Sequence, residues 1–199
     1  LNNSMSELWS RLGFLAIALV VYRIGTHIPI PGINPEQVAA LFQQSQGTIL
    51  QYFNLFSGGA LERMSIFALS VVPYISSAIV MQLFSNSVPY LQELKKDGQA
   101  GRNKITQYTR YGTVIFALIQ SSALTVTLQT AGLIDAGSIF SAFTAVISIV
   151  TGTMFLMWLG EQISERGIGN GISIIIATSI ITGVPRAFGQ ALEQTQQGD

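Results

Sequence analysis

The residue types that usually carry chemistry in proteins are scarce in this sequence. Cysteine is absent and His27 is the single histidine, which excludes disulfides, zinc–thiolate sites, a cysteine nucleophile and a multi-histidine metal site. The sequence also contains no pair of aspartates at membrane depth, no Gly-x-Ser-x-Gly elbow and no His-Glu-x-x-His helix. We therefore predict that the protein is not an enzyme and has no cofactor-binding or metal site.

One glycine-rich segment, Gly167-Ile168-Gly169-Asn170-Gly171, superficially matches a dinucleotide-binding loop. The match is weak, because the segment follows an apolar stretch instead of a strand, its third glycine is one residue early, and no acidic ribose partner follows at the expected distance. Glycine permits positive φ angles, so the segment is better interpreted as a tight turn after Arg166.

The composition indicates that the bilayer is the solvent. Of the 199 residues, 49% are hydrophobic and only 10% are charged, with a mean hydropathy of +0.46, whereas about a quarter of the residues in soluble domains are charged. The ten basic residues balance the ten acidic ones, so the net charge gives no reason to expect a nucleic-acid partner or an acidic one.

A membrane-spanning helix needs about 20 mostly apolar residues, and five stretches meet this requirement. The first contains Arg23, whose long side chain can snorkel to an interface, and Pro29, Pro31 and Pro35 follow it. No cleavable signal pattern precedes this stretch, so we expect it to act as targeting signal and anchor. Pro73 is expected to kink the second. The expected spans are approximately 12–28, 65–85, 108–130, 138–160 and 169–184.

The basic residues between these stretches predict their orientation. Five lie between spans two and three or at the start of span three, against Arg63 alone before span two and none between spans three and four. The positive-inside rule then places the 86–107 loop and the amino terminus in the cytoplasm, and the loop at Asp135 outside. The five basic residues are Lys95, Lys96, Arg102, Lys104 and Arg110.

The connection between spans one and two has two parts. Asn34, Pro35 and Gln37 fit the N-cap, N1 and N3 positions of a short external helix. The segment 47–63 that follows is too polar and too broken to span the membrane. Irregular backbone at membrane depth is tolerated inside protein or a water-filled cavity, so a re-entrant stopper is one interpretation. The segment alone favours an ordinary external loop.

Two aliphatic pairs could form a constriction. Val71 and Ile75 lie one helical turn apart in span two, and Ile172 and Ile176 do so in span five. Aliphatic side chains that converge from several helices can block water and ions by dewetting. Packing or lipid contact is the commoner role of such pairs, and the pattern alone does not choose between them.

Longer motifs give the sequence a strong resemblance to bacterial SecY, the channel subunit of the Sec translocon. It begins with Arg23-Ile24-Gly25, continues through 28–33 and 53–61, and extends over 107–113 and 151–176. The resemblance covers essentially the whole chain, with 133–140 matching least well. SecY has ten spans in two pseudo-symmetric halves that close like a clamshell around a pore. The expected fold is thus an all-α polytopic membrane protein, with five transmembrane helices and a short re-entrant plug helix making one such half.

The resemblance also implies roles for particular residues. Val71, Ile75, Ile172 and Ile176 align with the pore ring, where the family usually has isoleucine at the first position. Spans two and three are implied to form one side of the lateral gate, the exit toward lipid, and Ser76 and Gln120 align with positions that face it. The segment of approximately 51–64 is implied to be the plug that closes the external funnel, with Tyr52, Phe53, Asn54, Leu55, Phe56, Ser57, Gly58, Gly59, Ala60 and Leu61 as its central residues.

By resemblance, the function is to translocate unfolded secretory proteins and to release membrane proteins laterally into the bacterial plasma membrane. The implied partners are SecE, SecG, the SecA motor, the ribosome, signal peptides, nascent chains, the lipid bilayer and the second half of SecY. No nucleic-acid site is expected in this chain. The alternative is half of an inverted-repeat secondary transporter, although spans two to five lack the intramembrane acidic residues or histidine usual in ion-coupled transport. A non-conducting scaffold or insertase subunit would need neither plug nor ring.

Overall fold

The computed structural model describes residues 2–44, 49–134 and 138–196. Within these ranges every regular element is an α-helix, and the only extended pairing is an isolated antiparallel bridge between Pro29 and Ser65. The all-α prediction is therefore confirmed. The helices are α1 (Asn2–Gly25), α2 (Pro35–Gln44), α3 (Ile49–Phe56), α4 (Val72–Ser87), α5 (Pro89–Lys96), α6 (Gly98–Thr130), α7 (Ile139–Arg166) and α8 (Gly171–Gln196).

Three described helices are long and apolar enough to cross a membrane. They are α1, from Met5 onward, α6 and α7, and a shorter apolar helical stretch covers Gly171–Pro185 in α8. Helix α4 has 16 residues, which at 1.5 Å per residue is about 24 Å and shorter than a hydrocarbon core of about 30 Å. Length and composition thus account for three spans, and the count of five stays a prediction.

The expectation for span two was wrong at its amino-terminal end. We expected a helix over 65–85 with a kink at Pro73, but α4 begins at Val72 and Pro73 lies in its first turn. The first helical turn needs no N–H from proline, so Pro73 starts this helix and does not bend it. Met64 and Ser70 have φ angles of 43° and 50°, which a right-handed helix does not contain. Hydropathy could not reveal this, because a buried irregular segment is as apolar as a helix.

The other boundaries differ because helices continue past the apolar zone. The 86–107 connection is helical, formed by α5 and the first turns of α6. Helix α8 passes through Pro185 to Gln196, beyond the expected end at 184. Helix α1 extends far upstream of 12, where Arg11 and Glu7 form an i, i+4 ion pair, and it ends at Gly25. The tight turn at 167–170 is confirmed, and Gly169 has a φ of 72°.

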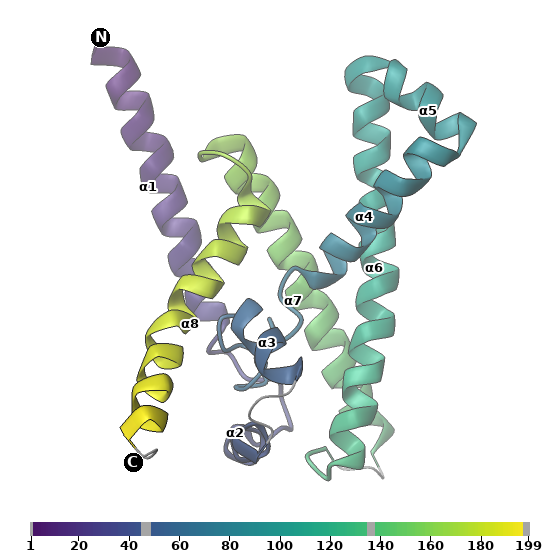
Figure 1. Ribbon diagram of the computed structural model, residues 1–199. Coiled ribbons are helices and arrows are strands. Elements are labelled where there is room, and N and C mark those ends of the chain that lie inside the picture. Colours follow the sequence, from purple (N-terminus) through teal and green to yellow (C-terminus); the bar gives the residue numbers. More distant parts are fainter. Residues whose placement is uncertain (1, 45–48, 135–137, 197–199) are drawn as a thin grey trace.

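The helices form a layer in which each packs on its neighbour along the row. Figure 1 shows α1 and α8 on one side, α7 in the middle, and α4, α5 and α6 on the other side. Helix α4 lies along α6, α6 packs on α7, and α7 packs on both α8 and α1. The segment of α3 and the turns after it occupies the space enclosed by these elements, and α3 contacts α8.

Two apolar clusters fill the interior. One surrounds the segment after α3 with residues that include Ile30, Met64 and Ile149. The other joins α1, α7 and α8 to the start of α4, with Tyr22, Phe67 and Leu156 among its members. Irregular backbone from 57 to 71 thus lies against protein on several sides, as its unpaired polar groups require in a membrane.

Candidate functional site

The predicted plug is a two-turn helix closed by a glycine cap. The N–H of Gly58 donates to Leu55 O at 3.1 Å and that of Gly59 to Asn54 O at 2.9 Å, with φ angles of 65° and 80°. These two bonds form a Schellman motif, which ends a helix with a left-handed glycine. Asn54 holds the following turn, because its Oδ1 accepts from Glu62 N at 3.0 Å and its Nδ2 donates to Glu62 Oε2 at 3.1 Å. The plug segment is therefore a defined folded unit.

The two ends of this unit differ in burial. Ser57, Ala60 and Leu61 are buried, whereas the aromatic side chains of Tyr52 and Phe53 are exposed. Phe56 is exposed as well, and Leu55 is half-buried against α8. The described chain therefore packs the carboxyl-terminal turn of the plug firmly and leaves an aromatic face of its helix open.

The four aliphatic candidates lie in one cluster. Val71 is buried in the cluster that joins α1, α7 and α8, and Ile75, Ile172 and Ile176 pack against it. Val71 is the N-cap of α4, and its carbonyl accepts from Ile75 N at 3.0 Å, so the two side chains share one helical turn. The structure thus brings together candidates from α4 and α8, which lie about a hundred residues apart in the sequence.

The same cluster holds residues that the sequence reasoning missed. Ala60 of the plug is fully buried in it, together with Ile175 between the two candidates of α8. Ala60 is too small to be recognised in the sequence as part of a constriction. Ile175 differs from the neighbouring isoleucines only in the face of α8 on which it lies. Only the fold reveals that the plug and the aliphatic residues share one apolar interior.

The predicted gate helices are joined by a residue next to the predicted one. Ser77 Oγ donates to Thr109 O at 2.7 Å, and a Cβ added at Gly112 would overlap Ser77 Oγ, so α4 and α6 approach closely at this point. Ser76 and Gln120 are half-buried. Which of the two adjacent serines meets α6 depends on the rotation of α4 about its axis, and the gate roles of Ser76 and Gln120 stay predictions.

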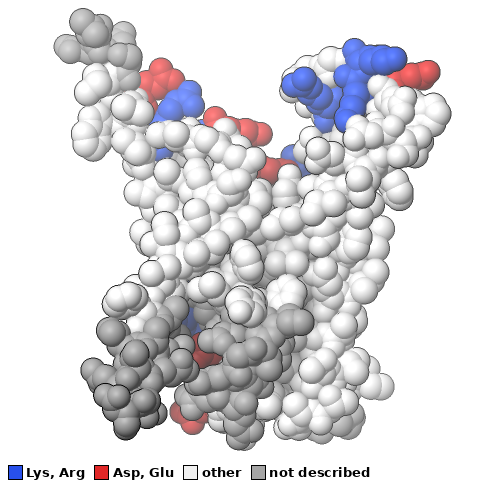
Figure 2. Space-filling model, in the orientation of Figure 1, with Lys and Arg blue, Asp and Glu red and all other residues white. Residues whose placement is uncertain are grey.

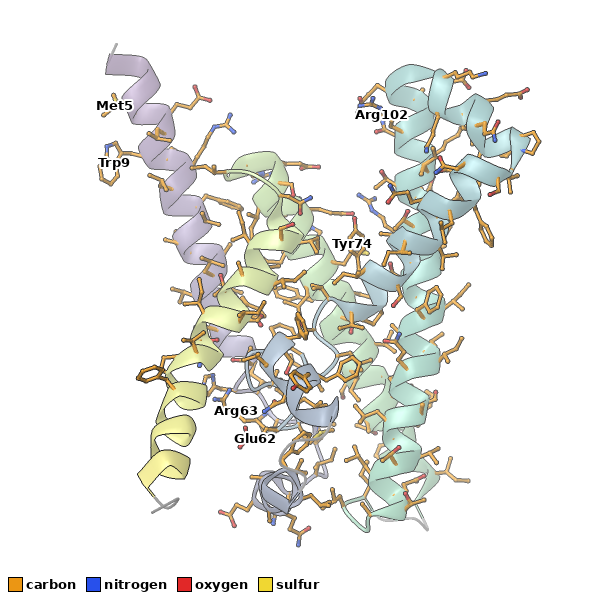
Figure 3. The ribbon with its side chains drawn as sticks, viewed as in Figure 1. Met5, Trp9, Glu62, Arg63, Tyr74 and Arg102 are labelled. Carbon is orange, nitrogen blue, oxygen red and sulfur yellow. The ribbon has the colours of Figure 1, made fainter. Side chains whose placement is uncertain are left out.

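The basic residues gather at one end of the molecule. Figure 2 shows Lys and Arg concentrated at its upper end, over α5 and the start of α6. Lys95 and Lys96 lie in the last turn of α5, and Arg102, labelled in Figure 3, and Lys104 lie in the first turns of α6. The five residues expected in a loop therefore lie on helices, the fifth of them being Arg110.

Arg110 has a specific partner. Its Nε and Nη2 donate to Glu161 Oε1 and Oε2 at 2.8 and 2.9 Å, so the two groups form a bidentate ion pair. The pair connects α6 to α7 and leaves the arginine 46% exposed. It lies at the polar end of both helices, where the apolar stretch of α7 gives way to charged residues.

Arg23, near the carboxyl end of α1, is the charged residue that the first expected span contains. Its Nη1 donates to Gly58 O of the plug at 3.1 Å. Separately, among the described residues no group of three or more His, Cys, Asp or Glu is placed to hold a metal ion.

Comparison with known proteins identifies the family. A sequence profile described as SecY matches residues 65–198. The chain is 58% identical over 198 residues to the protein translocase subunit SecY of Pseudomonas aeruginosa, and 54% identical over 202 residues to that of Escherichia coli K12. These alignments cover all of this chain but only 45% and 46% of the relatives, so the chain spans about half the length of the curated relatives it matches.

Solved structures share the fold. Sec61 in the canine ribosome-channel complex from the endoplasmic reticulum superposes with a TM-score of 0.66 at 19% identity, covering 96% of this chain and 42% of that one. A structure described as a protein conducting channel gives the same values. At 19% identity these matches show that the fold is shared and no more. This chain covers less than half of each solved chain, as it does of the sequence relatives.

Proposed function

Because the chain belongs to the SecY family, we propose that it forms one half of a protein-conducting channel, in which residues 51–64 are the plug and Val71, Ile75, Ile172 and Ile176 contribute to the pore ring. This half corresponds to the amino-terminal half of its relatives. The complete channel translocates unfolded secretory proteins and releases membrane proteins into the bilayer through a lateral gate, of which α4 and α6 form one side. The reading as half of a secondary transporter is not favoured.

One observation carries this proposal: Ala60 of the plug and the four aliphatic residues belong to or pack against the same apolar cluster. A ring of aliphatic side chains excludes water and ions without a binding site. A plug that rests against the ring adds a second barrier to water and ions. The arrangement therefore fits a passive conduit that a partner drives.

The polar ends support an orientation in the bacterial plasma membrane. Lys95, Lys96, Arg102 and Lys104 lie together at one end, and the Arg110–Glu161 pair lies at the same end of α6 and α7. By the positive-inside rule this end faces the cytoplasm, together with the amino terminus. The predicted external loop at Asp135 lies outside the described residues.

The proposed partners follow from this placement. The cytoplasmic end would meet SecA or the ribosome together with the second half of SecY, and SecE and SecG would complete the complex. Signal peptides would enter at the lateral gate, along the side formed by α4 and α6. No specific nucleic-acid site is proposed within this half.

The test is site-specific crosslinking of a stalled secretory chain in the complete channel. A photoreactive residue at Ile75 or Ile176 should crosslink to the chain in transit, because both positions border the proposed conduit. Ile119 and Phe143 are the matched controls, since both are apolar, helical and more than half exposed, and they should crosslink to lipid. If neither Ile75 nor Ile176 contacts the secretory chain while the controls behave as expected, the channel assignment fails for these residues.

A further inference from the structure

Two adjacent side chains of α1 hold two adjacent carbonyl groups of the plug. The hydroxyl of Tyr22 lies 3.3 Å from Ser57 O as its donor, and Arg23 Nη1 donates to Gly58 O at 3.1 Å. Ser57 and Gly58 are the residues at which α3 ends and the chain turns. Figure 3 labels Glu62 and Arg63 in the turns that follow, next to the lower part of α8. The plug is thus hydrogen-bonded to α1 at the turn that follows its helix.

The hydrogen atoms at this site can be counted. The single hydroxyl hydrogen of Ser179 is donated to Ile175 O at 2.8 Å, so Ser179 Oγ is an acceptor toward Tyr22. The hydroxyl of Tyr22 therefore donates, and it is shared between Ser179 Oγ and Ser57 O. Ser179 of α8 thus orients the Tyr22 hydroxyl, which also bonds to the carbonyl of Ser57 in the plug. Tyr22 is completely buried.

Shape reinforces these polar contacts. A Cβ added at Gly58 would lie 3.3 Å from both Ser179 Cα and the Tyr22 hydroxyl oxygen, and 3.4 Å from Thr182 Oγ1. A Cβ at Gly183 would overlap Leu55 Cδ1. The plug therefore sits against α8 at glycines on both surfaces, and its carbonyls reach Tyr22 and Arg23 because nothing larger than hydrogen separates the backbones.

We propose that Tyr22, aimed by Ser179, and Arg23 form a latch on α1 whose hydrogen bonds to Ser57 O and Gly58 O set how readily the plug leaves its resting position. These are positioning residues, since neither belongs to the aliphatic ring. The inference rests on the proposed function of the segment as a plug. It adds a polar element to a closure otherwise made of apolar contacts, and it places that element on α1 and α8, which lie on the other side of α7 from α4 and α6 (Figure 1).

The contacts predict a graded response. The Tyr22–Ser57 bond is long and neutral, whereas the bond from Arg23 is charge-assisted, and such bonds are about twice as strong as neutral ones. Loss of one neutral bond should raise the population of displaced plug by about two- to tenfold. Loss of the arginine should raise the population of displaced plug further. Lysine keeps the charge but loses the fork geometry, so Arg23→Lys should raise this population less than a neutral residue does.

The experiment uses the complete SecY complex in vesicles, with Ser57→Cys as reporter. This chain has no cysteine, any cysteine elsewhere in the complex is replaced by serine, and Ser57 is buried. The exchange keeps the backbone carbonyl but weakens the hydroxyl's bonds to Asn54 O and Leu61 N, so every variant is compared with the Ser57→Cys background. The labelling rate by a membrane-impermeant maleimide then reports how often the plug is displaced. In this background Tyr22→Phe should increase the rate about two- to tenfold. Ser179→Ala loses the group that orients the phenol but leaves its hydrogen to Ser57 O alone, so it should increase the rate less than Tyr22→Phe, and the double variant should label no faster than Tyr22→Phe. Arg23→Gln should increase the rate further, with Arg23→Lys between.

Thr178→Ala is the matched control. Thr178 neighbours Ser179 on α8, and its hydroxyl likewise donates to the carbonyl four residues earlier, at 2.8 Å. It should label at the background rate. The latch is overturned if Tyr22→Phe and Arg23→Gln label no faster than the background, or if Thr178→Ala accelerates labelling equally, because general loosening of α8 would then explain the result. Translocation of a secretory chain by the reporter background is measured in the same vesicles, so that failure of the channel function is seen separately from failure of the latch.

Discussion

Gly152, in the middle of α7, supports the irregular segment that leads from the plug to α4. A Cβ built at this glycine would lie 2.7 Å from the carbonyl carbon of Ile66 and closer still to its oxygen, and 3.2 Å from Phe67 Cδ1. Cβ atoms essentially never approach other atoms within 3.0 Å. The obstacle is backbone, so Gly152→Ala cannot be accommodated by the rotation of a side chain.

The size of the effect follows from what would have to move. Ile66 N donates to Ile28 O at 3.0 Å, and Ile30 N donates to Met64 O at 2.9 Å. A shift of Ile66 by about an ångström would disturb these two hydrogen bonds. It would also disturb the packing of Phe67 on the rings of Tyr22 and Phe155. Overpacking costs about 1–3 kcal/mol, and we expect the upper end. The relatives are more than twice as long as this chain, so for the complete protein that loss corresponds to a fall of about 3 °C in Tm.

The assay is thermal unfolding of the purified complete complex in one detergent, followed by tryptophan fluorescence. Gly13→Ala is the matched control, because Gly13 also lies within a helix and a Cβ there would have no atom within 4 Å. It should leave Tm unchanged or raise it slightly, since alanine favours helix more than glycine does. Equal melting temperatures for the two alanine variants would refute the close approach of α7 to Ile66.

Three further changes test other contacts. Arg110→Met should lower stability by less than about 1 kcal/mol at low salt, because the arginine is half exposed, and exchanging Arg110 with Glu161 should restore most of the loss in thermal melts. Gly112→Ala should force α4 away from α6 at Ser77, and Ser77→Gly should reverse the shift, as measured by the distance between spin labels on the two helices. Val71→Ile should leave the ion leak of the resting complete channel unchanged, because other ring members maintain the seal. A changed ion leak would contradict this prediction and show that the difference between valine and isoleucine at this position affects the seal.

The features that could be predicted from the sequence depend on residues close together in the chain. Asn34 caps α2 as expected, since its Oδ1 accepts from Glu36 N at 3.0 Å, and the glycines after Arg166 form the expected turn. Each signal lies within a few residues of the structure it specifies. The long apolar stretches likewise predicted α1, α6 and α7, because a spanning helix satisfies its own backbone hydrogen bonds.

The contacts that could not be predicted join residues far apart in the chain. Tyr22 and Ser57 are 35 residues apart, and Ser77 and Thr109 are 32 apart. Each depends on the rotation of two helices about their own axes, and a serine looks alike in the sequence whether it faces lipid, a neighbouring helix or the plug. Ser77 joins α4 to α6, whereas the role of its neighbour Ser76 at the gate stays a prediction.

The irregular segment from 57 to 71 shows why an error in predicting a helix can bear on function. A helix carries its hydrogen bonds within itself, so moving it leaves them intact, whereas this segment bonds to Ile28 and Ile30 and rests on Gly152. Its position is therefore fixed by partners on other elements, and each partner adds separately to the barrier against displacement. A segment of this kind can leave its site without melting a helix. The apolar run before Val72 is thus an irregular connection between the proposed plug and α4, and not the first half of a transmembrane helix.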